Sequence, residues 1–237
     1  MALEVIIILS IIQGFTEFLP ISSSAHLVFL SEIFGDFISK RNFDVSLHFG
    51  SLLAVIIYLR KEILEIILDL IFYKKRDKDG FKILINLIIS TIPIVCIGFL
   101  IHLYHFDIIR SLEIIGWSTL VFGIILGIAD KNLKIMKILK NLNPREAFLL
   151  GIAQTLALIP GTSRSGIVIT AGLFMGYSRY EASKYSLLLS IPVILAATTL
   201  ESLSLYSDKG SLFSYEIFIG IVISFITALI TIKLFMK

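Results

Sequence analysis

The stretch QGFTEFLPISSSAHL, residues Gln13–Leu27, interrupts an apolar segment near the start of the chain. Proline and the run of serines disfavour a continuous helix here, because proline lacks a backbone donor and small polar residues favour turns. A second interruption, IPGTSRSG at residues 159–166, has the same character. We therefore predict a helix–loop–helix arrangement for two segments, at about 3–34 and 146–176.

The composition is that of a membrane protein. The 237 residues are 57% hydrophobic and 16% charged, with a mean hydropathy of +0.93, whereas soluble domains carry about 25% charged residues. We predict one all-α polytopic membrane domain over residues 1–237. The segment at 61–73 is too short and too acidic on one face to span, so an interfacial helix is expected. The predicted spans, each near the length that crosses a bilayer, lie at about 44–59, 81–103, 111–129, 180–200 and 214–235.

The distribution of basic residues indicates whether the two broken segments cross the membrane or re-enter on the same side. Irregular backbone at membrane depth survives only inside protein or beside a wet cavity, so broken helices mark a site. If both segments are re-entrant, sixteen of the 21 basic residues share one side and Arg164 lies in the second break. This asymmetry favours re-entry and a cytoplasmic C-terminus. Only four basic residues would lie on the outer side: Lys40, Arg41, Arg110 and Lys209.

The two broken segments also resemble each other. Each has a glutamine in its first half, then a proline, then a serine three residues later: Gln13, Pro20 and Ser23, and Gln154, Pro160 and Ser163. The first would enter from the outer face and the second from the cytoplasm, to meet near the midplane. Such a pattern is typical of an inverted-topology repeat with a site at its interface.

Three ionisable residues, Glu17, His26 and Arg164, fall in the broken segments. Each costs about 3 kcal/mol or more at bilayer depth, so each needs a partner or a function. Gln13 precedes Glu17 by four residues, which places both on one helix face, where they could share a metal ion or a proton. The alternatives are a structural carboxyl for Glu17 and interhelical hydrogen bonding for Gln13.

The serine triplet in the first turn precedes a second half-helix. Ser22, Ser23 and Ser24 would stand at its N-terminus, where free backbone N–H groups attract anions such as phosphate. Simple N-capping is the alternative for each serine. His26 lies one turn further on, where it could accept a hydroxyl proton or attack phosphorus itself.

The second turn, PGTSRSG, offers the complementary groups. Its glycines let the backbone approach a ligand, its hydroxyl groups can donate, and the guanidinium of Arg164 matches phosphate oxygens. The alternative for Arg164 is an ion pair with Glu17, which need not exclude function. We predict phosphate contacts from Gly161, Thr162, Ser163 and Ser165.

These two motifs, with FDVSLHFGSLLAV at residues 43–55 between them, resemble the undecaprenyl-diphosphate phosphatase family, the bacitracin-resistance phosphatases, along the whole chain. The role of His48 in the middle motif is left open between support of the site and core packing. The residues that match the family's two motifs are Gln13, Glu17, Ser23 and His26, and Pro160, Gly161, Ser163, Arg164 and Ser165.

The resemblance implies a multi-pass enzyme of the bacterial inner membrane, with its active site facing the outer side. It would hydrolyse undecaprenyl diphosphate with a divalent cation, Mg²⁺ or Ca²⁺, recycling the cell-wall lipid carrier and conferring bacitracin resistance. Ser23 is the preferred nucleophile with His26 as general base, while attack by His26 or by water stays open. The expected roles are catalysis by Glu17, Ser23, His26 and Arg164, phosphate binding by Ser22, Ser24, Gly161, Thr162, Ser163 and Ser165, and metal binding by Gln13 and Glu17.

A transporter or flippase of phosphorylated polyprenyl lipid is the alternative function, because broken helices and inverted repeats also occur in transporters. The basic loops are of the kind that set membrane topology, so nucleic acid is not an expected partner. The oligomeric state, including a homodimer, is left open.

Overall fold

The computed structural model describes residues 2–34, 41–72, 79–104, 111–131, 136–207 and 214–237. Within these ranges the chain is helical and contains no strand, only an isolated bridge between Lys137 and Tyr177. Eight basic residues of the charge argument lie outside them: Lys40, Lys74, Lys75, Arg76, Lys78, Arg110, Lys134 and Lys209. The helices are α1 (Leu3–Thr16), α2 (Ser23–Phe34), α3 (Arg41–Tyr58), α4 (Arg60–Ile71), α5 (Asp79–Leu103), α6 (Leu112–Lys131), α7 (Pro144–Thr155), α8 (Arg164–Phe174), α9 (Arg179–Ser207) and α10 (Tyr215–Phe235), with short 3-10 turns η2 (Leu139–Asn141) and η3 (Leu156–Leu158).

In the described part of the chain, four helices are long and apolar enough to cross a membrane: α5, α6, α9 as far as Leu203, and α10. They confirm four of the five predicted spans. The segment predicted to span at 44–59 forms α3, whose residues Phe43–Tyr58 belong with the shorter apolar helices, so this span is not confirmed. At 1.5 Å per residue the 18 residues of α3 reach about 27 Å, slightly less than the hydrocarbon thickness of about 30 Å.

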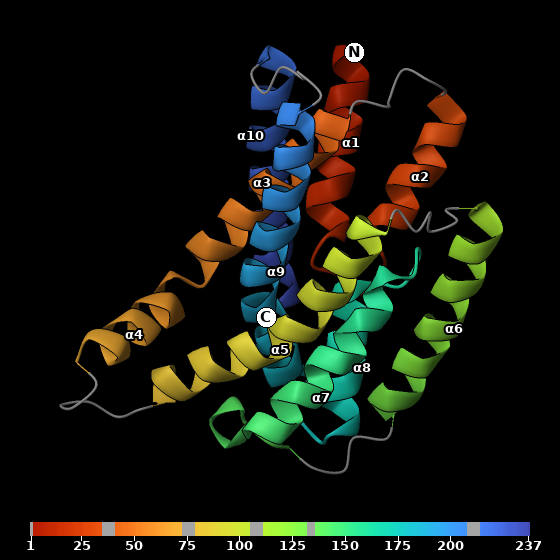
Figure 1. Ribbon diagram of the computed structural model, residues 1–237. Coiled ribbons are helices and arrows are strands. Elements are labelled where there is room, and N and C mark those ends of the chain that lie inside the picture. The colour runs from red at the N-terminus through yellow and green to blue at the C-terminus, as the bar shows by residue number, and fades with distance from the viewer. Residues whose placement is uncertain (1, 35–40, 73–78, 105–110, 132–135, 208–213) are drawn as a thin grey trace.

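The short helix α3 lies inside the bundle, where it packs against α10, α9 and α1 (Figure 1). Its contact with α10 includes a hydrogen bond from Ser224 Oγ to the Leu47 carbonyl oxygen at 2.8 Å. Helices α1 and α10 also cross closely, because a Cβ on Gly14 would lie 2.6 Å from the Ser224 carbonyl oxygen. Small residues let apolar helices approach in this way.

Both interrupted segments form helical hairpins, as predicted. The first hairpin consists of α1, a turn at 17–22 and α2, and the second of α7, η3, a turn at 159–163 and α8. Figure 1 shows the hairpins extending toward opposite ends of the molecule, with their turns near its middle. This arrangement places both sequence motifs in one region.

The second hairpin has a defined start. Asn143 caps α7 with Pro144 in its first turn, and Asn143 and Glu146 form a reciprocal capping box. The Glu146 carboxylate also accepts hydrogen bonds from Lys137 Nζ and Tyr177 Oη, each at 2.8 Å. Although burial opposes ionisation, these hydrogen bonds hold the pKa of Glu146 below its ordinary value. The carboxylate thus ties α7 to the connection between α8 and α9.

Helix α4 confirms the prediction of a separate, non-spanning helix near 61–73. It follows α3 after a break at Leu59, whose φ and ψ are −91° and 18°. Figure 1 shows α4 projecting away from the bundle. Apolar side chains at helical spacing are exposed along it, namely Leu64, Ile67, Leu68 and Ile71.

Candidate active site

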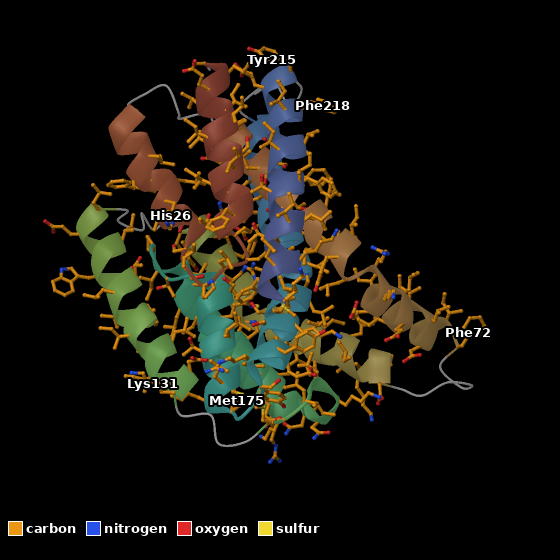
Figure 2. The ribbon with its side chains drawn as sticks, turned by 180° about the vertical axis from the view of Figure 1, so that it is seen from behind. His26, Phe72, Lys131, Met175, Tyr215 and Phe218 are labelled. Carbon is orange, nitrogen blue, oxygen red and sulfur yellow. The ribbon has the colours of Figure 1, made fainter. Side chains whose placement is uncertain are left out.

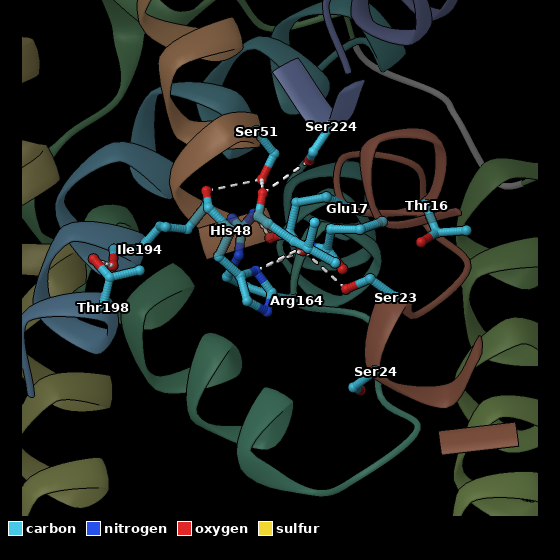
Figure 3. A network of polar contacts seen from close by, with 12 residues as sticks. Thr16, Glu17, Ser23, Ser24, His48, Ser51, Arg164, Ile194, Thr198 and Ser224 are labelled. Carbon is cyan, nitrogen blue, oxygen red and sulfur yellow. Dashed lines mark hydrogen bonds and ion pairs between the residues drawn. The ribbon is translucent and has the colours of Figure 1, made fainter. Parts of the chain in front are cut away.

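The Glu17 carboxylate joins the two hairpins (Figure 3). Its Oε2 accepts hydrogen bonds from Gln13 Nε2 at 2.9 Å and from Ser23 Oγ at 2.8 Å, both within the first hairpin. Its Oε1 lies 3.4 Å from Arg164 Nη2 of the second hairpin. The side chain of Glu17 is only 7% exposed, so this carboxylate is paired rather than solvated.

The local fold of the first turn explains this arrangement. Helix α1 ends next to Glu17, whose backbone N–H still donates to the Gln13 carbonyl oxygen at 3.0 Å. The pair therefore shares a helix face, as predicted. Ser22 has a φ of 55°, a strained conformation for a residue with a side chain. The chain reverses there, and α2 begins at Ser23 beside Glu17.

His48 supports this carboxylate. Its Nδ1 lies 2.9 Å from Gln13 Nε2 and 3.3 Å from Glu17 Oε2. It therefore accepts from the amide or, when protonated, donates to the carboxylate. Of the two roles that the sequence leaves open, the geometry favours support of the site. A sequence signal existed, because Asp44, His48 and Ser51 form a polar row at helical spacing in a largely apolar segment.

Arg164 reaches the site from the first turn of α8. Its side chain is 14% exposed, and its guanidinium donates from Nη1 to the Ser186 carbonyl oxygen at 3.5 Å besides pairing with Glu17. The ion pair considered as the alternative for Arg164 is thus present. A buried pair of this kind is sensitive to the loss of either partner, because the remaining charge is uncompensated.

The serines of the second turn bind the first turn. Ser165 Oγ donates to the Leu19 carbonyl oxygen at 2.8 Å, and Ser163 Oγ lies 3.4 Å from the same atom. Ser163 also caps α8 by accepting from the Gly166 N–H at 3.1 Å. These hydroxyls hold the two motifs together.

Helix α6 fixes the second turn from behind, a role that the sequence reasoning missed. Ser118 Oγ donates to the Pro160 carbonyl oxygen, and Thr119 Oγ1 donates to that of Gly161 at 3.0 Å. Gly161 has a φ of 91°, which glycine adopts without strain. The adjacent hydroxyl residues Ser118 and Thr119 within an apolar span were the available signal.

The remaining predicted residues lie around this centre. His26 Nδ1 donates to the Ser22 carbonyl oxygen at 2.8 Å. The Ser23 hydroxyl donates to Glu17 and not to His26. His26 is exposed and lies beside the turn region in Figure 2. Ser24 is exposed, with its Oγ 3.3 Å from that of Ser22. Thr162 Oγ1 is buried without a hydrogen-bond partner in the described part of the chain.

Of the residues present, Gln13 and Glu17 could hold a divalent cation if a bound phosphate supplied further oxygens. Gln13 Oε1 is buried and has no hydrogen-bond partner among the described residues, which leaves an oxygen ligand beside the Glu17 carboxylate. Those residues include no group of three or more His, Cys, Asp or Glu side chains that could hold a metal. Mg²⁺ is commonly held in this way, by one or two carboxylates together with substrate phosphates.

The helices and the buried polar centre define a multi-pass helical membrane protein with an ionisable site between two hairpins. The family model of the bacitracin resistance protein BacA matches residues 6–237. The chain belongs to this BacA family, which confirms the resemblance found in the sequence.

Curated relatives cover nearly the whole chain, and each is named undecaprenyl-diphosphatase. The relative from Alteromonas mediterranea is 44% identical over 240 residues, covering 100% of this chain and 90% of the relative. That from Pelagibacter ubique is 43% identical over 98% of this chain and 86% of its own length. The relative from Aliivibrio salmonicida is 41% identical over 97% of this chain and 86% of its own length.

Proposed function

We propose that this chain is an undecaprenyl-diphosphate phosphatase, a membrane enzyme that hydrolyses undecaprenyl diphosphate to the monophosphate and inorganic phosphate. Its activity recycles the lipid carrier of cell-wall synthesis and confers bacitracin resistance. Membership of the BacA family and full-length relatives that bear the diphosphatase name support this function.

One observation carries the chemistry: a hydroxyl, a carboxylate and a guanidinium converge from two hairpins. Ser23 Oγ donates to Glu17 at 2.8 Å, and Arg164 pairs with the other oxygen of that carboxylate. A nucleophile beside a proton acceptor and a phosphate-binding cation is the set that phosphoryl transfer requires.

We assign the attack to Ser23. As Ser23 Oγ bonds to the terminal phosphorus, its proton passes to Glu17 and the bond to the bridging oxygen breaks, releasing the lipid monophosphate. Water then hydrolyses the phosphoserine and releases inorganic phosphate. Glu17 replaces His26 as the preferred base because the Ser23 hydroxyl is directed at it. Attack by His26 or by activated water is the alternative that variants at Ser23 test.

Phosphate binding is assigned to the two turns. Arg164 neutralises negative charge on the transferred phosphoryl group as its ion pair with Glu17 loosens. The backbone N–H groups at the start of α2 can also donate hydrogen bonds to a phosphate. When substrate binds, the Ser163 and Ser165 hydroxyls donate their hydrogen bonds to phosphate oxygens instead of to the Leu19 carbonyl oxygen. The remaining proposed contacts come from Ser22, Ser24, Gly161 and Thr162.

A divalent cation, Mg²⁺ or Ca²⁺, completes the proposed site. Gln13 and Glu17 would hold it, since the free Gln13 Oε1 adds a neutral oxygen to one carboxylate. When bound, such an ion neutralises charge on the diphosphate.

We further propose that the two hairpins are re-entrant halves of an inverted repeat in the inner membrane. Their opposite directions in Figure 1 and the concentration of basic residues on one side support this arrangement. The first hairpin then opens to the outer side, so the substrate enters from there.

The test is phosphate release from undecaprenyl diphosphate by purified protein in detergent with Mg²⁺ or Ca²⁺. Release in the absence of a membrane gradient is expected of an enzyme. No release under these conditions, together with movement of the lipid across liposome membranes, would instead establish the transporter alternative.

A further inference from the structure

A polar hollow lies away from the residues of the candidate active site. It has a volume of about 340 Å³ and is formed where the junction of α3 and α4 meets the start of α9 and the end of α10. None of the residues assigned to catalysis, phosphate or metal lines it. Its lining residues include Tyr58, Arg60, Lys61, Tyr180, Lys184 and Lys233.

The hollow carries an excess of positive charge. Lys184 Nζ is paired with Glu62 at 2.9 Å, which also lines the hollow. The other three cations, Arg60, Lys61 and Lys233, are exposed, and none forms an ion pair within the described part of the chain. The uncompensated charge therefore favours an anionic ligand.

The neighbouring helix places this hollow at the level of lipid headgroups. Helix α4 exposes an apolar row at helical spacing, with Leu64 55%, Ile67 44% and Ile71 65% exposed. Arg60 and Lys61 start the helix and Glu62, Glu65 and Asp69 follow them on it, and an amphipathic helix of this kind is expected to lie in the membrane interface. Tyr58 and Tyr180 at the hollow are of the type enriched at that level.

The walls match a lipid better than a free anion. Beside the cations, the hollow is lined by the apolar residues Ile57, Leu229 and Met236, which suit the glycerol and the first acyl carbons of a lipid. The N-terminus of α4 has no side-chain cap, so its first N–H groups add to the attraction for phosphate. We propose that this hollow binds the headgroup of an anionic phospholipid on the basic side of the protein.

Native mass spectrometry of the detergent-purified protein tests this site. The probes are dioleoyl phosphatidylglycerol and zwitterionic dioleoyl phosphatidylcholine, compared by the number of lipids retained. The test variant is Lys61→Gln with Lys233→Gln. The matched control is Lys131→Gln with Arg145→Gln, which removes the same charge from exposed positions outside the hollow. Phosphate release in detergent should be unchanged in both variants.

We expect the wild type to prefer phosphatidylglycerol and the test variant to bind it about tenfold more weakly, because each basic residue adds to the attraction. The control should keep the wild-type preference. Equal retention by the test variant, or an equal loss in the control, would overturn the proposal. Displacement of phosphatidylglycerol by 10 mM inorganic phosphate would also overturn it, since the site would then recognise a free anion.

Discussion

Arg164 and Glu17 are separated by 147 positions in the chain, yet Nη2 of one lies 3.4 Å from Oε1 of the other. Their side chains are 14% and 7% exposed, respectively. The pair joins the turns of two hairpins that come from opposite ends of the molecule (Figure 1). The pair is therefore a contact between the hairpins, and in the proposed mechanism its two members also take part in the chemistry.

Replacing Glu17 by glutamine should abolish measurable phosphate release and destabilise the protein by roughly 3–5 kcal/mol. The physical reason is that Arg164 would keep a buried charge without a partner. Activity and the thermal unfolding temperature should be measured together, with Glu113→Gln as a control at an exposed position of α6.

The double variant Glu17→Gln with Arg164→Gln separates stability from catalysis. It removes both charges, so part of the lost stability should return while activity stays absent. Activity near the wild-type level in either variant would exclude the pair from the catalytic site.

Ser23→Ala should lower the rate of phosphate release by about 100-fold or more, because it removes the proposed nucleophile. Thr199→Ala is the control: its side chain is exposed on α9 and its hydroxyl donates to the Leu195 carbonyl oxygen, away from the proposed site. The control should stay within a few fold of wild type. Equal activities of the two variants would show that Ser23 is not the nucleophile and that His26 or water attacks the phosphorus.

His48→Gln should lower the rate about tenfold with little change in folding yield, since His48 contacts Gln13 and Glu17 and would act by positioning them. The expected signature is a loss of kcat and an altered pH profile rather than a raised KM. His102→Gln, at an exposed histidine of α5, provides the comparison. An unchanged pH profile would indicate that His48 contributes only to packing.

Chelation by EDTA should abolish activity, and Mg²⁺ or Ca²⁺ should restore it. Gln13→Glu adds a second carboxylate and should lower the half-saturating cation concentration by about tenfold, because ligand charge tunes affinity. Gln13→Leu removes the free oxygen and should raise that concentration. If neither variant alters the cation dependence, the metal site does not include residue 13.

Gly161→Ala should destabilise the protein by roughly 2 kcal/mol or more. A Cβ there would clash with Ser118 Oγ and the backbone of Ile115, and the φ of 91° strains any residue with a side chain. Gly123→Ala in α6 is the control, because no atom lies within 4 Å of its added Cβ. Thermal unfolding compares the two, and an equal effect would show that the turn tolerates a side chain.

The sequence by itself determined the class of protein, four of its long helices and the two interrupted segments. Length and apolar composition decide whether a segment can span, and proline with small polar residues decides where a helix stops. The four-residue spacing of Gln13 and Glu17 placed both on one helix face, because α-helical geometry is local. The candidate residues were identified by the cost of a charge in an apolar segment.

Only the tertiary structure decided which partners these residues have. It paired Ser23 with Glu17 instead of His26, brought His48 onto the same carboxylate, and used Ser118 of α6 to hold the second turn. These contacts join residues on different helices, and their distances depend on how small residues let those helices pack. Sequence periodicity assigns a side chain to a helix face, whereas three-dimensional packing selects the atom that this face meets.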